Sequence, residues 1–159
     1  MEELKEKIEK LFKDKIISFE VKEMPVIVVK KEIIEELIKY LKEEEKFSML
    51  LDITAVDYLK WHEKKEKRFE IVYHLFSLEY NRRIRIKVPI GEDEGILSMT
   101  SLFKNANWLE REVYDMFGIH FIAHPDLRRI LMYDEFEGYP LRKDYPLKKR
   151  QPRLEGLED

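Results

Sequence analysis

The sequence of 159 residues contains no cysteine, few glycines and no apolar run long enough to cross a membrane. Without thiols the chain forms no disulfide and holds no iron–sulfur cluster through cysteine ligands. Its five glycines stand apart from one another, so the chain has no G-x-G or G-K-[ST] loop for binding phosphate. These absences exclude a cluster-bearing electron carrier and argue against a nucleotide site in this chain.

The start of the chain and its charge balance exclude further classes. The segment Met1–Lys5 is charged and lacks the apolar core of a secretory signal, so we expect a cytosolic chain with no direct membrane insertion. The net charge of −3 gives no global reason to expect a nucleic-acid partner. The basic stretch 148–153 is short and is followed by Glu155, Glu158 and Asp159, so it does not indicate a nucleic-acid site either.

The periodicity of apolar residues predicts the order helix, two strands, helix, three strands and helix. Helices are predicted over 2–14, 30–46, around 96–103 and over 107–117, and strands over 16–21, 26–29, 49–58, 69–78 and 83–88. The strand 69–78 is nearly all apolar, which is typical of burial on both faces. Pro89 should end the next strand, 83–88. We expect an α+β fold: a two-layer sandwich of a mostly antiparallel sheet with helices on one face.

The helix over 107–117 is the best delimited. Its apolar residues recur at helical spacing and form one stripe: Leu109, Val113, Met116 and Phe117. Asn107 and Glu110 have the spacing of a capping box, and Gly118 stands where a helix ends most easily. The other face carries Glu110, Arg111, Glu112 and Asp115. Such a face is usually solvated, but it could also form an ionic cluster in which Arg111 holds two carboxylates.

The chain after residue 123 has a different character, which divides the sequence into an α+β domain, 1–123, and an extended C-terminal arm, 124–159. Four prolines break any long helix in the arm, yet apolar anchors recur at irregular spacing. The arm either folds back over its own sheet or wraps another protein. Residues 128–153 contain eight Lys or Arg and four Asp or Glu, so an acidic groove would suit the arm.

Two long motifs resemble a known family. The run from Glu110 through Asp115-Met116-Phe117-Gly118 to His124-Pro125 and Arg128-Arg129-Ile130-Leu131 resembles the signature of the C-type, or 30-kDa-type, subunit of respiratory complex I, the proton-translocating NADH:quinone oxidoreductase. Residues 138–147 are similar to the tail of that family.

This resemblance implies a non-catalytic structural subunit of the peripheral arm, on the cytoplasmic side of the cell membrane. Its partners would be the large quinone-site (D-type) subunit and other peripheral-arm subunits. FMN and the iron–sulfur clusters would lie elsewhere in the complex, with no cofactor in this chain.

The resemblance also implies which residues serve partner binding and assembly. They are Glu110, Arg111, Glu112, Asp115, Phe117, Gly118, His124, Pro125, Arg128, Arg129, Ile130, Leu131, Tyr139, Pro140, Leu141, Arg142, Lys143, Asp144, Tyr145 and Pro146. We expect the charged face of the 107–117 helix to form a partly buried ionic cluster with Arg128 and Arg129, at the joint between domain and arm.

Two other functions are compatible with the sequence. The first is the equivalent subunit of a membrane-bound [NiFe] hydrogenase, a formate hydrogenlyase or an F420- or ferredoxin-linked dehydrogenase, which have relatives of the 30-kDa-type subunit. The second, more distant, is a stand-alone metalloenzyme that uses His120 and His124. Gly118 and Pro125 bracket these histidines, so we expect no shared helix face and no metal or catalytic site. His120 should lie in a strand, and His124 should hydrogen-bond the backbone as a hinge.

Overall fold

The computed structural model describes residues 2–152, and the chain forms a five-stranded sheet, a small two-stranded sheet and three α-helices within that range. Met1 and the end of the predicted arm, 153–159, lie outside the described residues. The elements in chain order are α1 (Glu2–Phe12), β1 (Ile16–Glu20), β2 (Val26–Val29), α2 (Ile34–Glu43), β3 (Met49–Asp57), β4 (Phe69–Ser77), β5 (Arg82–Ile90), β6 (Gly95–Leu97), α3 (Ala106–Phe117) and β7 (His120–Ile122), with 3-10 turns at Lys13–Lys15 and Lys31–Ile33.

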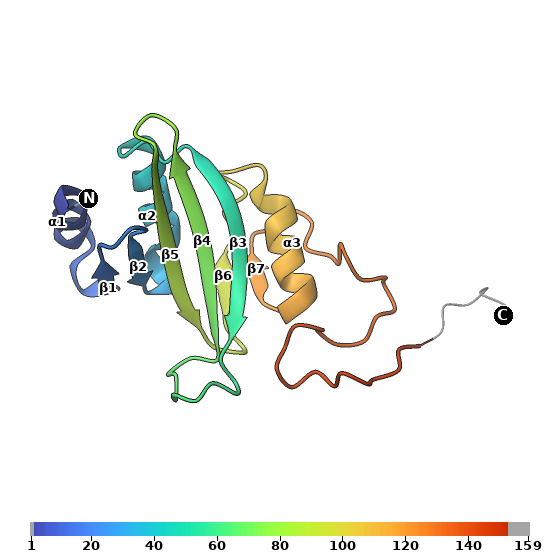
Figure 1. Cartoon of the computed structure of the whole chain (residues 1–159). Coiled ribbons are helices and arrows are strands. Elements are labelled where there is room, and N and C mark those ends of the chain that lie inside the picture. Colours follow the sequence, from blue (N-terminus) through green and yellow to red (C-terminus); the bar gives the residue numbers. More distant parts are fainter. Residues whose placement is uncertain (1, 153–159) are drawn as a thin grey trace.

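The large sheet has the strand order β1-β2-β5-β4-β3, and only β2 and β5 run parallel within it. Figure 1 shows α2 behind this sheet and α3 beside its β3 edge, while the front face is not covered by a helix. The predicted α+β class with a mostly antiparallel sheet is confirmed. None of the helices in residues 2–152 has the length and apolar character needed to cross a bilayer.

The core lies between the back of the sheet and α2. Alternate residues of β4 and β5 point to this side and are fully buried, as are four residues of α2: Ile34, Leu37, Ile38 and Leu41. Burying one such side chain contributes about 1.5–3 kcal/mol. Side chains return to the same face every 2 residues in a strand and every 3.6 residues in a helix, which accounts for this packing.

Three predictions for the sheet region are wrong. β4 is not buried on both faces, because Glu70, His74 and Phe76 on its front side are half-buried. Pro89 does not end β5 but lies within it, past the last pair that β5 forms with β2, so no neighbouring strand requires its missing N–H. The predicted helix 96–103 is instead β6 followed by turns, because β6 pairs in parallel with β7.

The helix α3 begins one residue earlier than predicted and is not capped as predicted. Asn105 occupies the position before the helix, and its side chain donates to the Leu50 carbonyl at 2.8 Å instead of to α3. Asn107 lies inside the helix, and Glu110 turns toward the segment before α3, so no capping box forms. Gly118 ends the helix in the left-handed conformation with φ of 73°, as expected, and the ring of Tyr139 lies against it.

Replacing Gly118 should destabilise the domain. An alanine there would keep a left-handed backbone, which costs about 1–2 kcal/mol, and its Cβ would meet the Tyr139 ring at 2.5 Å. We expect Gly118→Ala to lower the free energy of unfolding by at least that amount in urea titrations. The double variant Gly118→Ala/Tyr139→Ala should recover only the part of the lost stability that comes from the clash with the Tyr139 ring.

Gly91 supplies the control, because its φ is not positive and its nearest neighbour is the flexible Glu94 side chain. Gly91→Ala should change stability by less than about 0.5 kcal/mol. Equal stability of the Gly118 and Gly91 variants would contradict the prediction.

Candidate functional site

The polar face of α3 is turned into the protein. The side chains of Glu110 and Asp115 are fully buried and Arg111 is nearly so, whereas Glu112 is exposed. The alternative of a solvated helix face is therefore wrong for three of the four charged residues. Buried charged groups require partners, and the partners define the site.

Asp115 captures the arm through its carboxylate. Its Oδ2 accepts the amides of Ile130, Leu131 and Met132 at 3.1, 2.8 and 2.9 Å, and its Oδ1 accepts Nη1 of Arg129 at 2.6 Å. Burial alone would raise the pKa of the Asp115 carboxyl, but these donors, the Met132 amide first, outweigh burial and hold the pKa below its usual range. We call Asp115 with Arg129 and residues 130–132 the Asp115 anchor.

Arg111 holds the segment just before this anchor. Its Nε donates to the Arg128 carbonyl at 3.1 Å and its Nη2 to the Arg129 carbonyl at 2.9 Å, while its guanidinium lies over the Trp108 ring. Arg111 thus binds backbone carbonyls, and the expectation that it holds two carboxylates is wrong. Arg128 also stays outside the cluster, because its exposed side chain pairs with Asp126 at 2.9 Å.

Glu110 is buried apart from the Asp115 anchor, against the segment that precedes α3. Its carboxylate accepts the Ser98 hydroxyl and the Met99 amide, each at 2.6 Å, and its Oε2 lies 4.0 Å from Nε2 of His124. Burial raises the pKa of Glu110 to about 7, against the opposing effect of the two hydrogen bonds. The Tyr73 hydroxyl, whose pKa is raised by burial and by the Glu110 charge, is buried with no hydrogen-bond partner in residues 2–152.

A second anchor holds the arm further along the chain, at the end of β3. Asp57 accepts the Lys143 amide at 2.9 Å and Nη2 of Arg68 at 3.1 Å, and Arg68 also pairs with Glu92 and Asp144, each at 2.8 Å. Burial would raise the pKa of Asp57, but Arg68 and the amides of Lys143 and Leu59 together lower it. We call this group the Asp57 anchor.

Between the two anchors the arm binds the end of α3. Arg142 donates Nε to the Phe117 carbonyl at 2.6 Å and Nη1 to Glu92 at 2.9 Å, and its guanidinium lies 4.7 Å from the centre of the Tyr139 ring. The Leu141 amide donates to the Met116 carbonyl at 3.1 Å. The last orphan carbonyls of the helix are therefore satisfied by the arm.

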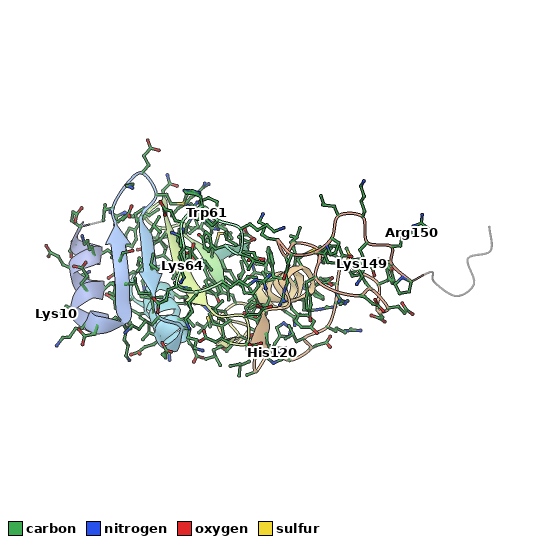
Figure 2. All side chains as sticks on the ribbon, turned by 90° about the horizontal axis from the view of Figure 1, so that it is seen from below. Lys10, Trp61, Lys64, His120, Lys149 and Arg150 are labelled. Atoms are coloured by element: carbon green, nitrogen blue, oxygen red, sulfur yellow. The ribbon has the colours of Figure 1, made fainter. Side chains whose placement is uncertain are left out.

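The remaining predicted residues face outward or contact one another. Pro125, Ile130, Leu131, Leu141, Lys143 and Pro146 are exposed, and Pro140 is half-buried. Tyr145 stacks on Phe136 with 6.0 Å between ring centres and contacts Gln151. Figure 2 shows Lys149 and Arg150 at the part of the arm that lies far from the sheet. A role of these residues in partner binding stays a prediction, as does the division at residue 123.

The two histidines of the metalloenzyme hypothesis do not converge. His120 is exposed on β7, as predicted for a strand residue. The ring of His124 is buried, with Nε2 3.1 Å from the Asn107 carbonyl oxygen and Nδ1 accepting the Asp126 amide at 3.0 Å, so the predicted contacts with the backbone are present, while its role as a hinge stays a prediction. No three His, Asp or Glu side chains within the described range are placed to hold a metal ion.

The sequence did not identify several residues of the site, namely Asp57, Arg68, Glu92 and Ser98. Asp57 had a weak signal, because a carboxylate interrupts an otherwise apolar strand. Arg68 and Glu92 lie in charged stretches where nothing in the local pattern distinguishes them. Only the closeness of these stretches to the arm in the fold reveals their role.

Comparison with known proteins places these residues in a family context. The model of the family described as "Respiratory-chain NADH dehydrogenase, 30 Kd subunit" matches residues 27–151. The chain is 54% identical over 123 residues to the C-type NADH-quinone oxidoreductase subunit of Trichlorobacter lovleyi, covering 77% of this chain and 74% of that protein. It is 48% identical over 150 residues to the protein of the same name from Dinoroseobacter shibae, covering 92% and 67%.

Solved structures agree. A trypsin-resistant fragment (1–134) of Nqo5 superposes with a TM-score of 0.69 at 33% identity, over 78% of this chain and 98% of that one. A chain of the membrane-bound sulfane sulfur reductase, an archaeal respiratory membrane complex, superposes with a TM-score of 0.76 at 27% identity, over 92% and 86%.

Removing the Asp115 carboxylate should release the arm. Asp115→Asn keeps the shape but presents an amide to buried donors, which should lower the free energy of unfolding by about 3 kcal/mol or more. Trypsin should then cut after Arg128 and Arg129 much faster than in the wild type. The control is Glu112→Gln on the exposed side of α3, and equal cleavage of both variants would contradict the role of the anchor.

Glu110 should make the domain less stable as the pH rises from 5 to 8. Its folded-state pKa of about 7 lies above the ordinary 4.5, so its stabilisation is fully present below pH 4.5 and is lost as the pH approaches and passes 7. At about 1.4 kcal/mol per pKa unit, this loss amounts to about 3 kcal/mol.

Glu110→Gln stays neutral, so its thermal midpoint should fall less over this range than that of the wild type. Asp57 and Asp115 do not interfere, because their lowered pKa values place their titration in more acidic solution. If the thermal midpoint of Glu110→Gln changed with pH in parallel with those of the wild type and Glu112→Gln, Glu110 would not be the source of the pH dependence.

Proposed function

Because the chain belongs to the family of the 30 kDa subunit of respiratory-chain NADH dehydrogenase, we propose that it is a structural subunit of a multi-subunit NADH–quinone oxidoreductase. In this proposal it packs against the large quinone-site (D-type) subunit and other peripheral-arm subunits. It has no activity of its own but is required for assembly of the route from NADH to quinone.

The observation that carries this proposal is the orientation of the arm. The amides of Ile130 to Met132 and of Lys143, and the charged groups of Arg129 and Asp144, are bound to the domain by the Asp115 and Asp57 anchors. Met132 packs against the core of the domain, but three leucines of the arm point the other way: Leu131 is 58% exposed, Leu141 51% and Leu147 fully exposed. Each would gain about 1.5–3 kcal/mol on full burial, which a partner surface would supply.

The charge and rigidity of the arm also suit a partner surface. Residues 128–153 contain eight basic and four acidic residues, so the arm favours an acidic groove. Two anchors fix its course before a partner arrives, which lowers the entropy lost on association. Glu112 and Trp108 are exposed on α3 beside the arm and extend the same surface.

The redox chemistry of such a complex would take place in neighbouring subunits. FMN and iron–sulfur clusters would be bound there, since this chain has no cysteine to ligate a cluster. The protein would be peripheral, on the cytoplasmic side of the membrane, and attached through its partners.

A second candidate has a specific observation in its favour. The resemblance to a chain of an archaeal sulfane sulfur reductase complex allows an equivalent role in another membrane-bound respiratory complex. The NADH–quinone branch is preferred, because identity to a subunit of that branch reaches 54% but is 27% to the reductase chain.

The test is purification of the chain from the membranes of its own source in mild detergent, comparing wild type and Arg111→Ala. The wild type should copurify with the large quinone-site subunit, cluster-bearing subunits and NADH:quinone activity. Arg111→Ala loses two charge-assisted hydrogen bonds to the arm, each worth about 1.5–3 kcal/mol, so assembled complex should fall at least about tenfold. Turnover per assembled complex should stay within about twofold of wild type.

Lys39→Ala, on the exposed side of α2, is the control and should assemble normally. Normal assembly of Arg111→Ala with reduced turnover would refute a structural role. Recovery with a different electron-donor module would select the second candidate.

A further inference from the structure

The front face of the sheet carries a cluster of arginines at the end opposite the Asp57 anchor. Arg83 and Arg85 project from this face of β5, and Arg82 precedes them at the start of the strand. The turn that leads into β5 is fixed by Asn81, whose φ is +48°. We call Arg82, Arg83 and Arg85 the arginine patch.

The guanidinium groups of the arginine patch have few polar partners among residues 2–152. Over residues 2–152, none of the three guanidinium groups forms an ion pair with a carboxylate. Arg82 lies over the Tyr80 ring and Arg83 over the Phe76 ring, 5.5 and 5.7 Å from the ring centres. Arg85 donates Nε to Nε2 of His74 at 2.9 Å. Most of their remaining donors are thus free for an external acceptor.

A hollow lined by apolar and charged side chains lies beside the patch. Its volume is about 500 Å³, and its lining combines apolar Met24, Pro25 and Phe76 with basic Lys22, Arg82 and Arg83. Lys22 pairs with Glu20 at 2.7 Å, and Glu23 is the one acidic residue of the lining. An apolar side chain next to an acidic group is the chemistry that this hollow accommodates.

We propose that the arginine patch docks an acidic segment of a neighbouring subunit, with one apolar side chain of that segment seated in the hollow. Arg83 and Arg85 lie two residues apart on one strand, so their side chains emerge about 7 Å apart. Carboxylates four residues apart on a helix lie about 6 Å apart and match this spacing. A guanidinium binds a carboxylate with two parallel hydrogen bonds, which gives orientation as well as affinity.

The surrounding charges favour a protein segment over other occupants. A second copy of this chain would oppose arginine patch to arginine patch, and like charges repel. A nucleic acid would bring a continuous row of phosphates close to Glu23 and Asp52 beside the patch, whereas a short acidic segment needs only a few contacts.

This inference rests on the proposed function, because it adds a second point of attachment to the complex. The patch lies at the end of β4 and the start of β5, and the Asp57 anchor lies at the opposite end of these strands (Figure 1). The two contacts can therefore be tested separately.

The first experiment reverses the charge of the patch in the complex purified from its own source. Arg83→Glu/Arg85→Glu should lower the amount of this chain retained in the complex at least about tenfold in 0.15 M salt. Lys10→Glu/Lys39→Glu makes the same charge change on α1 and α2, away from the front face, and should be retained normally; Lys10 lies far from the arm in Figure 2. Thermal midpoints of the isolated chains show whether folding is affected. The single variant Arg83→Glu replaces an exposed side chain and leaves the hydrogen bond between Arg85 and His74 in place.

The second experiment identifies the acceptor. Arg83→Lys places a primary amine in the patch, and carbodiimide treatment of the complex should join it to an Asp or Glu of another protein of the complex. Cross-links only within this chain, together with normal retention of the reversed variants, would overturn the inference while leaving the proposed function intact.

Failure of the wild type to copurify with the oxidoreductase subunits would instead refute the proposed function. Binding of a single-stranded oligonucleotide or of anionic phospholipid vesicles, abolished by the reversal and without an intersubunit cross-link, would also overturn the inference and assign the patch to phosphates.

Discussion

The second half of the chain is organised by one buried carboxylate. Asp115 takes up three consecutive amides and a guanidinium, so a single side chain of α3 fixes the backbone over residues 130–132. That many donors keep the carboxylate charged inside the protein. Because a buried charge without partners costs several kcal/mol, α3 and the arm must become ordered together. The polar face of α3 is thus an internal surface, and the path of the arm follows from it.

Local sequence pattern locates most of the fold, because burial of one face imposes period 2 on strands and period 3.6 on helices. It fails where the deciding partner is distant. β6 is three residues long and is defined by its pairing with β7, so no periodicity marks it. The predicted capping box fails for a related reason, since Glu110 has the Ser98 hydroxyl and the Met99 amide within reach in the folded chain. Pro89 is tolerated in β5 only because β2 is short.

The candidate site is predictable as a set of residues but not as an arrangement. The sequence selects Glu110, Arg111 and Asp115 as one group, whereas the structure gives each a different partner. The partners are mostly backbone amides and carbonyls, which every residue carries and no sequence pattern displays. Asp57 and Arg68 could not be assigned for the same reason, because the arm residue that Asp57 binds contributes only its amide.

This division of contacts explains how a chain that lacks thiols and a phosphate loop, and has no clustered metal ligands in residues 2–152, could serve a large redox complex. The amides of residues 130–132 and the side chains of Arg129 and Arg142 are satisfied within the chain, so these groups require no partner to compensate for their desolvation. In the proposed assembly, the apolar side chains that point outward would be the main source of binding free energy, and apolar burial is tolerant of small errors in geometry. Orientation would then come from directional charged contacts. An anchored arm that presents apolar side chains and a separate patch of free guanidinium groups would provide affinity and orientation from two ends of one rigid sheet.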